Sequence, residues 1–128
     1  MNPAPGFMED PAHRLSARRA GVRVQVKYEG ALIADTREAV ALEEAMPAGS
    51  STVAPVVFYV PRKDVKMDRL IRTSHSTYCP FKGHASYYSL KDGPENVVWS
   101  YEAPYDEMRA IEGLLAFYPD KVEIVTVP

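Results

Sequence analysis

The strongest constraint on the fold is a period-two alternation of apolar and polar residues near the beginning of the chain. Residues 22–28 read VRVQVKY, with a valine at every second position. Successive side chains of a strand point to opposite faces of a sheet, so this pattern predicts a half-buried strand. The turn Glu29-Gly30 follows, and ALIAD (31–35) returns. We therefore predict an antiparallel β-hairpin here.

Other segments also have the composition of strands or of the turns between them. Strands are predicted at VVFYV (56–60), ASYYSL (85–90), VVWSYE (97–102) and KVEIVTV (121–127). The dense turn signal KDGPEN (91–96) joins two of them into a second hairpin. AVALEEAM (39–46) fits a helix and a strand equally well, and the Pro-, Gly- and Ser-rich residues 47–55 are predicted to form a loop.

One short helix is predicted over residues 105–112, because apolar side chains recur there at helical spacing. Asp106 and Glu107 lie near its start, where the helix dipole favours acidic groups. Gly113 interrupts the pattern, so an extended piece is expected after it. The sum is a mainly β protein, a single small antiparallel β domain with one short helix. Short strands joined by turns favour a barrel or a folded-over sheet above a βαβ fold.

The first twenty residues differ from the rest in composition. Three prolines fall among the first eleven residues, and Arg14, Arg18 and Arg19 follow. Proline removes a backbone donor and fixes φ, so neither a helix nor a central strand is expected there. We expect residues 1–20 to be an extended N-terminal arm or a flexible tail, and residues 21–128 to be a single β domain.

Charge and cysteine content exclude some classes of function. The 128 residues carry a net charge of -2, which gives no general attraction for nucleic acid or for an anionic membrane. One cysteine allows neither an internal disulfide nor a Cys-only zinc site. The first residues lack the apolar core of a signal peptide, so none is expected, and the sequence has no apolar run of about 18 residues. A cytoplasmic location is therefore expected. No cofactor is expected, and the oligomeric state stays open.

Side chains that could react or bind a ligand are concentrated in the stretch TYCPFKGHASYY (77–88). Glycine at position 83 allows a ligand to approach the backbone closely, and Lys82 beside it could hold a carboxylate or a phosphate. Arg62, at the end of another predicted strand, could lie at the edge of the same site. The alternative is a turn that enters a strand, with a solvated lysine.

Aromatic side chains follow on the second predicted hairpin. Residues two apart in a strand share a face, so Trp99 and Tyr101 point together, as do Ser86 and Tyr88. Across the hairpin these side chains could line an aromatic pocket. The alternative is that the aromatic residues form an ordinary core.

Cys79 is the obvious nucleophile, and Lys82, His75 or His84 could activate it. A free cysteine more often packs as a small apolar side chain. The spacing His-x3-Cys-x4-His is not a usual pattern of metal ligands, so no metal site is expected. Whether the protein is an enzyme stays open at this point.

Several phrases together resemble a known bacterial family, the domain of unknown function 427. They are NPAPGF, GALIADTREA, FYVPRKDV, TYCPFKGHASYY, NVVWSYEAP and LLAFYPDKVE, in this order. The resemblance implies a small all-β domain similar to β-tent (Mss4-like) domains, in which two antiparallel sheets lean together. Relatives of that architecture bind zinc through pairs of cysteines, which are missing here, or hold a small ligand in an aromatic cage. The resemblance implies no activity.

Three hypotheses follow. The first is a domain that binds a small polar or anionic molecule in a pocket made by Cys79, Lys82, Gly83 and the aromatic hairpin. The second is a cysteine-dependent enzyme that uses Cys79. The third is a protein-interaction module without a pocket, which works through its N-terminal arm and its surface.

Overall fold

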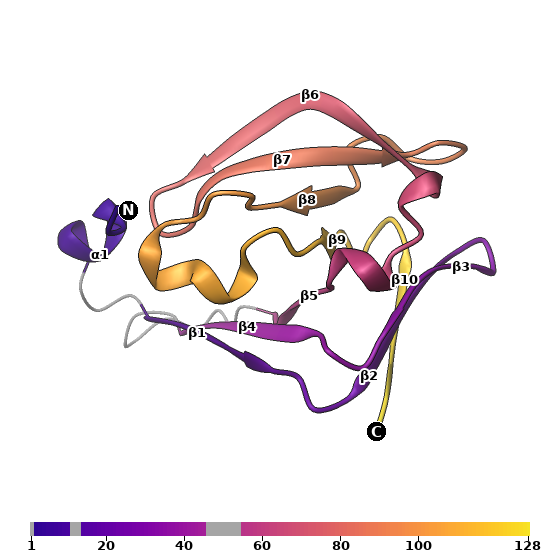
Figure 1. The fold of residues 1–128 in the computed structure, drawn as a ribbon, viewed down its shortest axis with the longest axis horizontal. Coiled ribbons are helices and arrows are strands. Elements are labelled where there is room, and N and C mark those ends of the chain that lie inside the picture. Colours follow the sequence, from indigo (N-terminus) through magenta and orange to yellow (C-terminus); the bar gives the residue numbers. More distant parts are fainter. Residues whose placement is uncertain (1, 11–13, 46–54) are drawn as a thin grey trace.

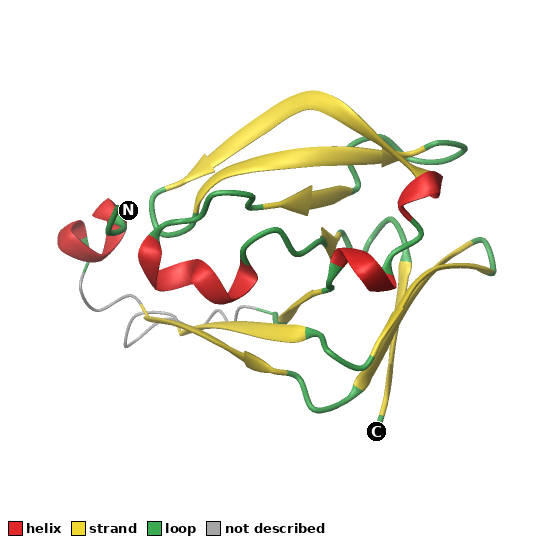
Figure 2. Ribbon diagram, viewed as in Figure 1, coloured by secondary structure: helices red, strands yellow, loops and turns green. Residues whose placement is uncertain are grey.

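The computed structural model describes residues 2–10, 14–45 and 55–128 and shows a mainly β protein with antiparallel sheets (Figure 2). The strands are β1 (Arg14–Arg19), β2 (Arg23–Tyr28), β3 (Ala31–Thr36), β4 (Val40–Ala45), β5 (Val57–Tyr59), β6 (Leu70–Cys79), β7 (Gly83–Leu90), β8 (Val98–Ser100), β9 (Ala116–Phe117) and β10 (Glu123–Val127). The helical elements are α1 (Pro5–Glu9) and the 3-10 helices η1 (Arg62–Asp64), η2 (Met67–Arg69) and η3 (Asp106–Ile111). No helix of the described residues is long and apolar enough to cross a membrane.

The strands form three sheets in two layers. One layer is the four-stranded sheet β6-β7-β8-β9, and the other holds the sheets β1-β4-β5 and β10-β2-β3 (Figure 1). Val60 and Leu115 join the layers along one side, since each donates its N–H to the carbonyl of the other at 2.7 and 2.9 Å. This bridge holds β5 beside β9.

Both predicted hairpins are confirmed. β2 pairs with β3, and positive φ angles at Glu29 and Gly30 form the tight turn between them. β7 pairs with β8 across the turn signal at residues 91–96. The final predicted strand is β10, which pairs with β2. The likeness to β-tent domains stays a prediction.

The ambiguous residues 39–46 contain the strand β4, which lies between β1 and β5. Val40 and Leu42 face the core there, so the period-two pattern decides against the helix propensity of alanine and glutamate. The loop predicted at residues 47–55 lies outside the described residues, except for Pro55.

The expectation that the first twenty residues form no helix is wrong for Pro5–Glu9. Pro5 occupies the first turn of α1, where a missing N–H costs no helical hydrogen bond. β1 is an edge strand that pairs with β4. The division of the chain at residue 20 stays a prediction.

The strand β6 was not predicted, because its outer face is exposed and its sequence has no clear period. It makes TYCPFKGHASYY a hairpin, in which the end of β6 and the start of β7 flank a turn at residues 80–82. The register shifts between Arg72 and Ser76, and β6 bows over β7 there (Figure 1). The helix predicted at 105–112 is the 3-10 helix η3, and β9 follows as the extended piece.

The core consists of two clusters of buried side chains. One, around Val26, Ile33, Val98 and Leu115, lies between β2-β3 and the four-stranded sheet. The other contains Leu42, Tyr59, Tyr87, Tyr101, Met108 and Ile111 and lies between β4-β5 and β7-β8. The second cluster is rich in tyrosine, and the candidate site is part of it.

Candidate functional site

A cavity of about 200 Å³ opens in the tyrosine-rich half of the protein, between the two layers. Side chains from β4, β5, β7 and β8, from the turn after β6 and from the segment after β9 surround it. The lining residues are Leu42, Glu44, Pro55, Val57, Tyr59, Lys82, Tyr87, Trp99, Tyr101 and Tyr118. Ligand sites for drug-sized molecules measure roughly 300–1,000 Å³, so this cavity suits a smaller molecule.

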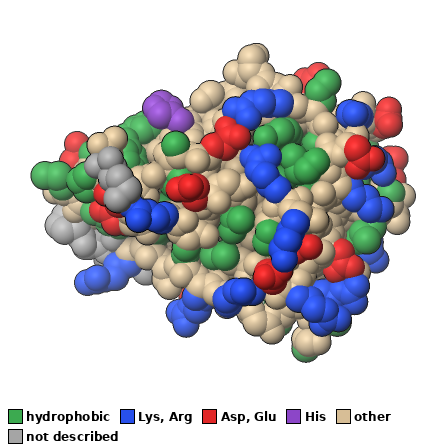
Figure 3. Space-filling view, in the orientation of Figure 1, with side chains coloured by type: hydrophobic (Ala, Val, Ile, Leu, Met, Phe, Trp, Pro, Cys, Tyr) green, Lys and Arg blue, Asp and Glu red, His purple; other side chains and the backbone are tan. Residues whose placement is uncertain are grey.

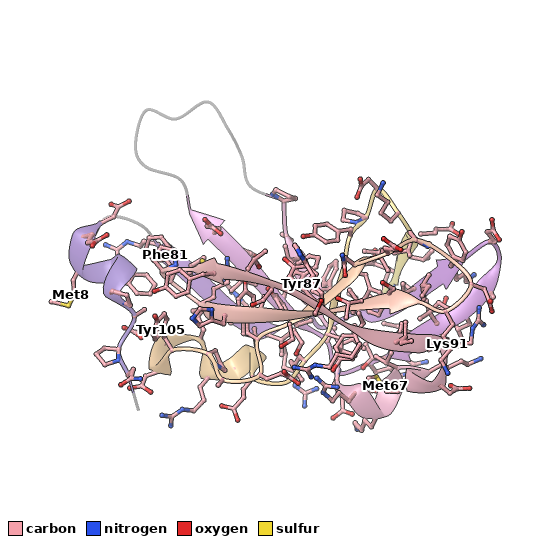
Figure 4. The ribbon with its side chains drawn as sticks, turned by 90° about the horizontal axis from the view of Figure 1, so that it is seen from above. Met8, Met67, Phe81, Tyr87, Lys91 and Tyr105 are labelled. Carbon is pink, nitrogen blue, oxygen red and sulfur yellow. The ribbon has the colours of Figure 1, made fainter. Side chains whose placement is uncertain are left out.

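The pairing of β7 with β8 decides which aromatic side chains meet. Tyr87 is directly opposite Trp99, and Tyr88 is opposite Val98. Paired residues project from the same face, so Tyr87 lies on the cavity side with Trp99 and Tyr101. Tyr88 projects from the other face and does not line the cavity. Tyr87 lies midway along the hairpin in Figure 4.

Trp99 is held by two aromatic neighbours. Its ring lies 4.5 Å from that of Tyr118, at an angle of 45°, and 6.4 Å from the ring of Tyr59 in an edge-to-face contact. Its indole Nε1 donates to the Tyr59 hydroxyl at 3.3 Å. These contacts orient the indole, and ring pairs of this geometry contribute roughly 0.5–1.5 kcal/mol beyond their buried area.

Three tyrosines of the cavity, Tyr59, Tyr101 and Tyr118, have raised pKa values. Burial raises the pKa of both Tyr59 and Tyr101. Burial, together with the hydroxyl of Tyr87 at 3.4 Å, raises the pKa of Tyr118 to about 12. The Tyr87 hydroxyl also bonds Thr77 Oγ1 at 2.9 Å. The phenols of Tyr59, Tyr101 and Tyr118 therefore present neutral hydroxyl groups, which can both donate and accept hydrogen bonds.

Lys82 extends from the turn between β6 and β7 into the cavity. Its Nζ lies 3.5 Å from Glu44 Oε1 on β4, and the Lys82 side chain is only 14% exposed. Among the described residues, Lys82 and Glu44 are the charged side chains that line the cavity. Lys82 was predictable from the sequence, and Glu44 is its counter-charge in the structure.

The backbone around Lys82 is fixed on both sides. Its N–H donates to the carbonyl of Cys79 at 3.2 Å, and its carbonyl accepts from Tyr105 N–H at 3.0 Å. Gly83 has a φ of +114°, a conformation that other residues rarely adopt, and a Cβ there would lie 3.5 Å from the Ala103 carbonyl oxygen. Gly83 thus shapes the turn and lines a separate depression by Pro104, not the aromatic cavity.

The N-terminal helix holds the same turn from outside. Gly6 N–H donates to the Pro80 carbonyl at 2.9 Å, and the rings of Phe7 and Phe81 meet edge to face at 5.0 Å. Ala4 N–H donates to Glu107 Oε1 at 2.9 Å, which ties the segment before α1 to η3. Met8 and Phe81 both lie toward the same end of the protein in Figure 4.

Cys79 is half-buried and packs against the tyrosine-rich cluster. The two nearby histidines have other neighbours, since the His75 ring contacts Tyr87 at 4.5 Å and the His84 ring contacts Tyr78 at 4.8 Å. In the part of the chain that the structure describes, no hydrogen bond joins either imidazole to the thiol. The described part of the chain also contains no group of three acidic, histidine or cysteine side chains close enough to hold a metal ion.

Arg62 and Tyr88 lie together in a different cluster. Arg62 donates to the Gly113 carbonyl at 2.9 Å and to the Tyr88 hydroxyl at 3.1 Å. Arg72 and Arg62 both contact the Glu102 carboxylate, at 2.7 and 3.3 Å. The hydrogen bonds from Arg72 lower the pKa of Glu102 to about 2. Arg62 does not line the aromatic cavity.

A larger depression of about 880 Å³ lies between the bowed part of β6 and the turn after β7. Polar and charged side chains make up most of its lining, and no tyrosine, tryptophan or phenylalanine is among the described residues that line it. Figure 3 shows basic and acidic side chains interspersed on the face seen in Figure 1. We take the aromatic cavity as the candidate site, because buried rings and an ion pair meet in it.

The structure therefore brings together three of the predicted site residues, Lys82, Trp99 and Tyr101, with Cys79 packed beside them. It adds Glu44, Tyr59, Tyr87 and Tyr118, which sequence reasoning did not select. Val57 and Tyr59 are two positions apart, as are Leu42 and Glu44. Residues two apart in a strand project from the same face, so the sequence did contain a signal that each pair shares a face. Which strands face one another was not visible in the sequence.

A scan against family models matches residues 16–128 to a domain of unknown function, DUF427. The chain belongs to this family, as the phrases quoted above indicated. No curated protein matches the chain.

Proposed function

We propose that this domain binds a small polar or anionic molecule in the aromatic cavity between its two layers. The observation that supports this most is the convergence of Trp99, four tyrosines and the partly buried Lys82 on one space of about 200 Å³. Small-molecule sites are typically apolar and aromatic, with a few convergent polar groups that orient the ligand. Here Lys82 would bind the acidic group, and Trp99 and Tyr101 would contact the body of the ligand.

The cavity is rigid on the side of Lys82. The backbone of the turn is bonded to Tyr105 and to α1, and the indole of Trp99 is oriented by Tyr59 and Tyr118. A site whose groups are already oriented loses less conformational entropy when a ligand binds. This pre-orientation supports binding.

The test is a thermal-shift screen with carboxylic acids, sugar phosphates and nucleotides, followed by titration. Trp99 is the only tryptophan of the chain, so its fluorescence reports directly on the cavity. A ligand at one hundred times its Kd stabilises the folded state by about 2.7 kcal/mol. We expect Lys82→Met and Trp99→Ala to lose this stabilisation.

The matched control is Lys91→Met. Lys91 is exposed and lies at the far end of the hairpin from Phe81 (Figure 4). This variant keeps the ligand response if the cavity is the site. The proposal is wrong if no compound stabilises the wild type more than it stabilises Lys82→Met and Trp99→Ala.

A further inference from the structure

The chemical class of the ligand can be narrowed by the charges in the cavity, and this inference rests on the proposed function. Lys82 and Glu44 come from different layers, 38 positions apart in the sequence, and meet at 3.5 Å. Their side chains are 14% and 31% exposed. The separation is longer than the roughly 2.7–2.9 Å of a charge-assisted hydrogen bond. The two groups therefore form an ionic contact at the wall of the cavity.

A ligand with a single charge fits this pair poorly. An anion that binds Lys82 places its negative charge next to the Glu44 carboxylate, and a cation that binds Glu44 lies next to the Lys82 ammonium. Like charges repel more strongly in a partly buried site than in water, since the effective dielectric constant is lower.

We propose that the ligand is a small zwitterion, an amino-acid-like molecule that carries a carboxylate and an ammonium group close together. Its carboxylate binds Lys82 and its ammonium binds Glu44, so that four charges alternate in sign. Each charge of the protein then has an opposite charge beside it in the bound state, as it has in the free state. The uncharged part of the ligand contacts the aromatic wall.

The wall fits this arrangement. Leu42 and Val57 supply apolar surface on one side, and Trp99 and Tyr101 supply aromatic rings on the other. Burial of an apolar body contributes about 25 cal/mol per Å² of surface removed from water. An ammonium group near an aromatic ring is further stabilised by the electrons of the ring face. The volume of about 200 Å³ limits the ligand to a small molecule.

The experiment is a calorimetric and Trp99-fluorescence titration with the L-amino acids, followed by two derivatives of the one that binds most tightly. The N-acetyl derivative keeps only the negative charge, and the amide keeps only the positive charge. We expect the free amino acid to bind at least tenfold more tightly than either derivative. A cyclic amide, 2-pyrrolidinone, serves as the uncharged probe and is expected to bind weakly.

The second part of the experiment tests variants of the Lys82–Glu44 pair. Glu44→Gln is expected to weaken binding of the amino acid at least tenfold while it leaves or improves binding of the N-acetyl derivative. Glu43→Gln is the matched control, because Glu43 is the exposed neighbour on β4 and projects from the opposite face. Circular dichroism and the Tm of each variant show that it is folded.

The outcomes separate the two proposals. If the N-acetyl derivative or the uncharged probe binds as tightly as the amino acid, the zwitterion is wrong and the cavity is still a ligand site. The same conclusion follows if only sugar phosphates, nucleotides or simple carboxylic acids bind. If no compound of either screen binds, both proposals are wrong.

Discussion

The Cα of Gly6 lies so close to the ring of Phe81 that a Cβ on Gly6 would be 2.7 Å from two ring carbons. A real Cβ essentially never makes such a contact, and the Pro80 carbonyl oxygen would lie only 2.9 Å away on another side. α1 can therefore dock on the turn between β6 and β7 only with glycine at this position. That turn carries Lys82 into the cavity, so the N-terminal segment supports the candidate site from outside.

Gly6→Ala is predicted to lower the free energy of unfolding by about 1–3 kcal/mol, the usual cost of overpacking. The extra methyl group cannot fit unless α1 moves away from Phe81. Urea denaturation measures the loss, and faster proteolysis near residue 10 would show that α1 is released. Met8→Ala is the control, because Met8 on the same helix is 82% exposed. An unchanged midpoint for Gly6→Ala would contradict the docking.

Glu102 is predicted to stabilise the protein above its ordinary pKa of 4.5 and to lose this effect as the pH falls toward 2. The reason is that hydrogen bonds from Arg72 lower its pKa in the folded state to about 2. The carboxylate is more than a third exposed, so the expected contribution is only about 1 kcal/mol.

The measurement compares Glu102→Gln with the wild type by urea denaturation between pH 3 and pH 7. The difference in the free energy of unfolding should be largest at pH 7 and should shrink as the pH falls below 4.5. Glu123→Gln, an exposed position on β10, is the control for the loss of a surface charge. A difference that stays constant with pH would contradict the ion pair.

Tyr118 is predicted to titrate near pH 12 in the folded protein and at a lower pH in Tyr87→Phe. Burial is the main reason for its raised pKa, and the bond to the Tyr87 hydroxyl is the second, so only part of the shift should disappear. NMR of 13Cζ-labelled tyrosine resolves the individual phenols. Tyr78→Phe is the matched control, because the Tyr78 hydroxyl bonds that of Tyr105 on the exposed side of the protein. No change in Tyr87→Phe would mean that the two hydroxyls are not bonded.

Cys79 is predicted to react slowly with iodoacetamide in the folded protein and rapidly in urea. The side chain is half-buried against the tyrosine-rich cluster, so access limits the reaction. Mass spectrometry follows the modified fraction over time. A fast reaction at neutral pH that is lost in Lys82→Ala would contradict this prediction and would favour the cysteine-dependent enzyme.

Local sequence patterns were enough to predict the two hairpins of the fold. The period of two in residues 22–28 and the turn signals after Tyr28 and Leu90 depend on neighbours within a few positions, so they were readable without a structure. The strand β6 escaped prediction, because an edge strand with few buried side chains carries no apolar period. α1 escaped prediction because proline, which disfavours helix interiors, is accepted in the first turn of a helix, where Pro5 lies.

The sequence alone determined the mainly β class, the family and the lysine-glycine turn with Trp99 as the residues to examine. Only the tertiary structure decided which side chains share the cavity. The register of β7 against β8 sets Tyr87, and not Tyr88, beside Trp99, and a change of one position would reverse this. The contact of Glu44 with Lys82 depends on how two sheets pack. Packing between distant segments follows from the sum of all contacts, which no short stretch of the chain encodes.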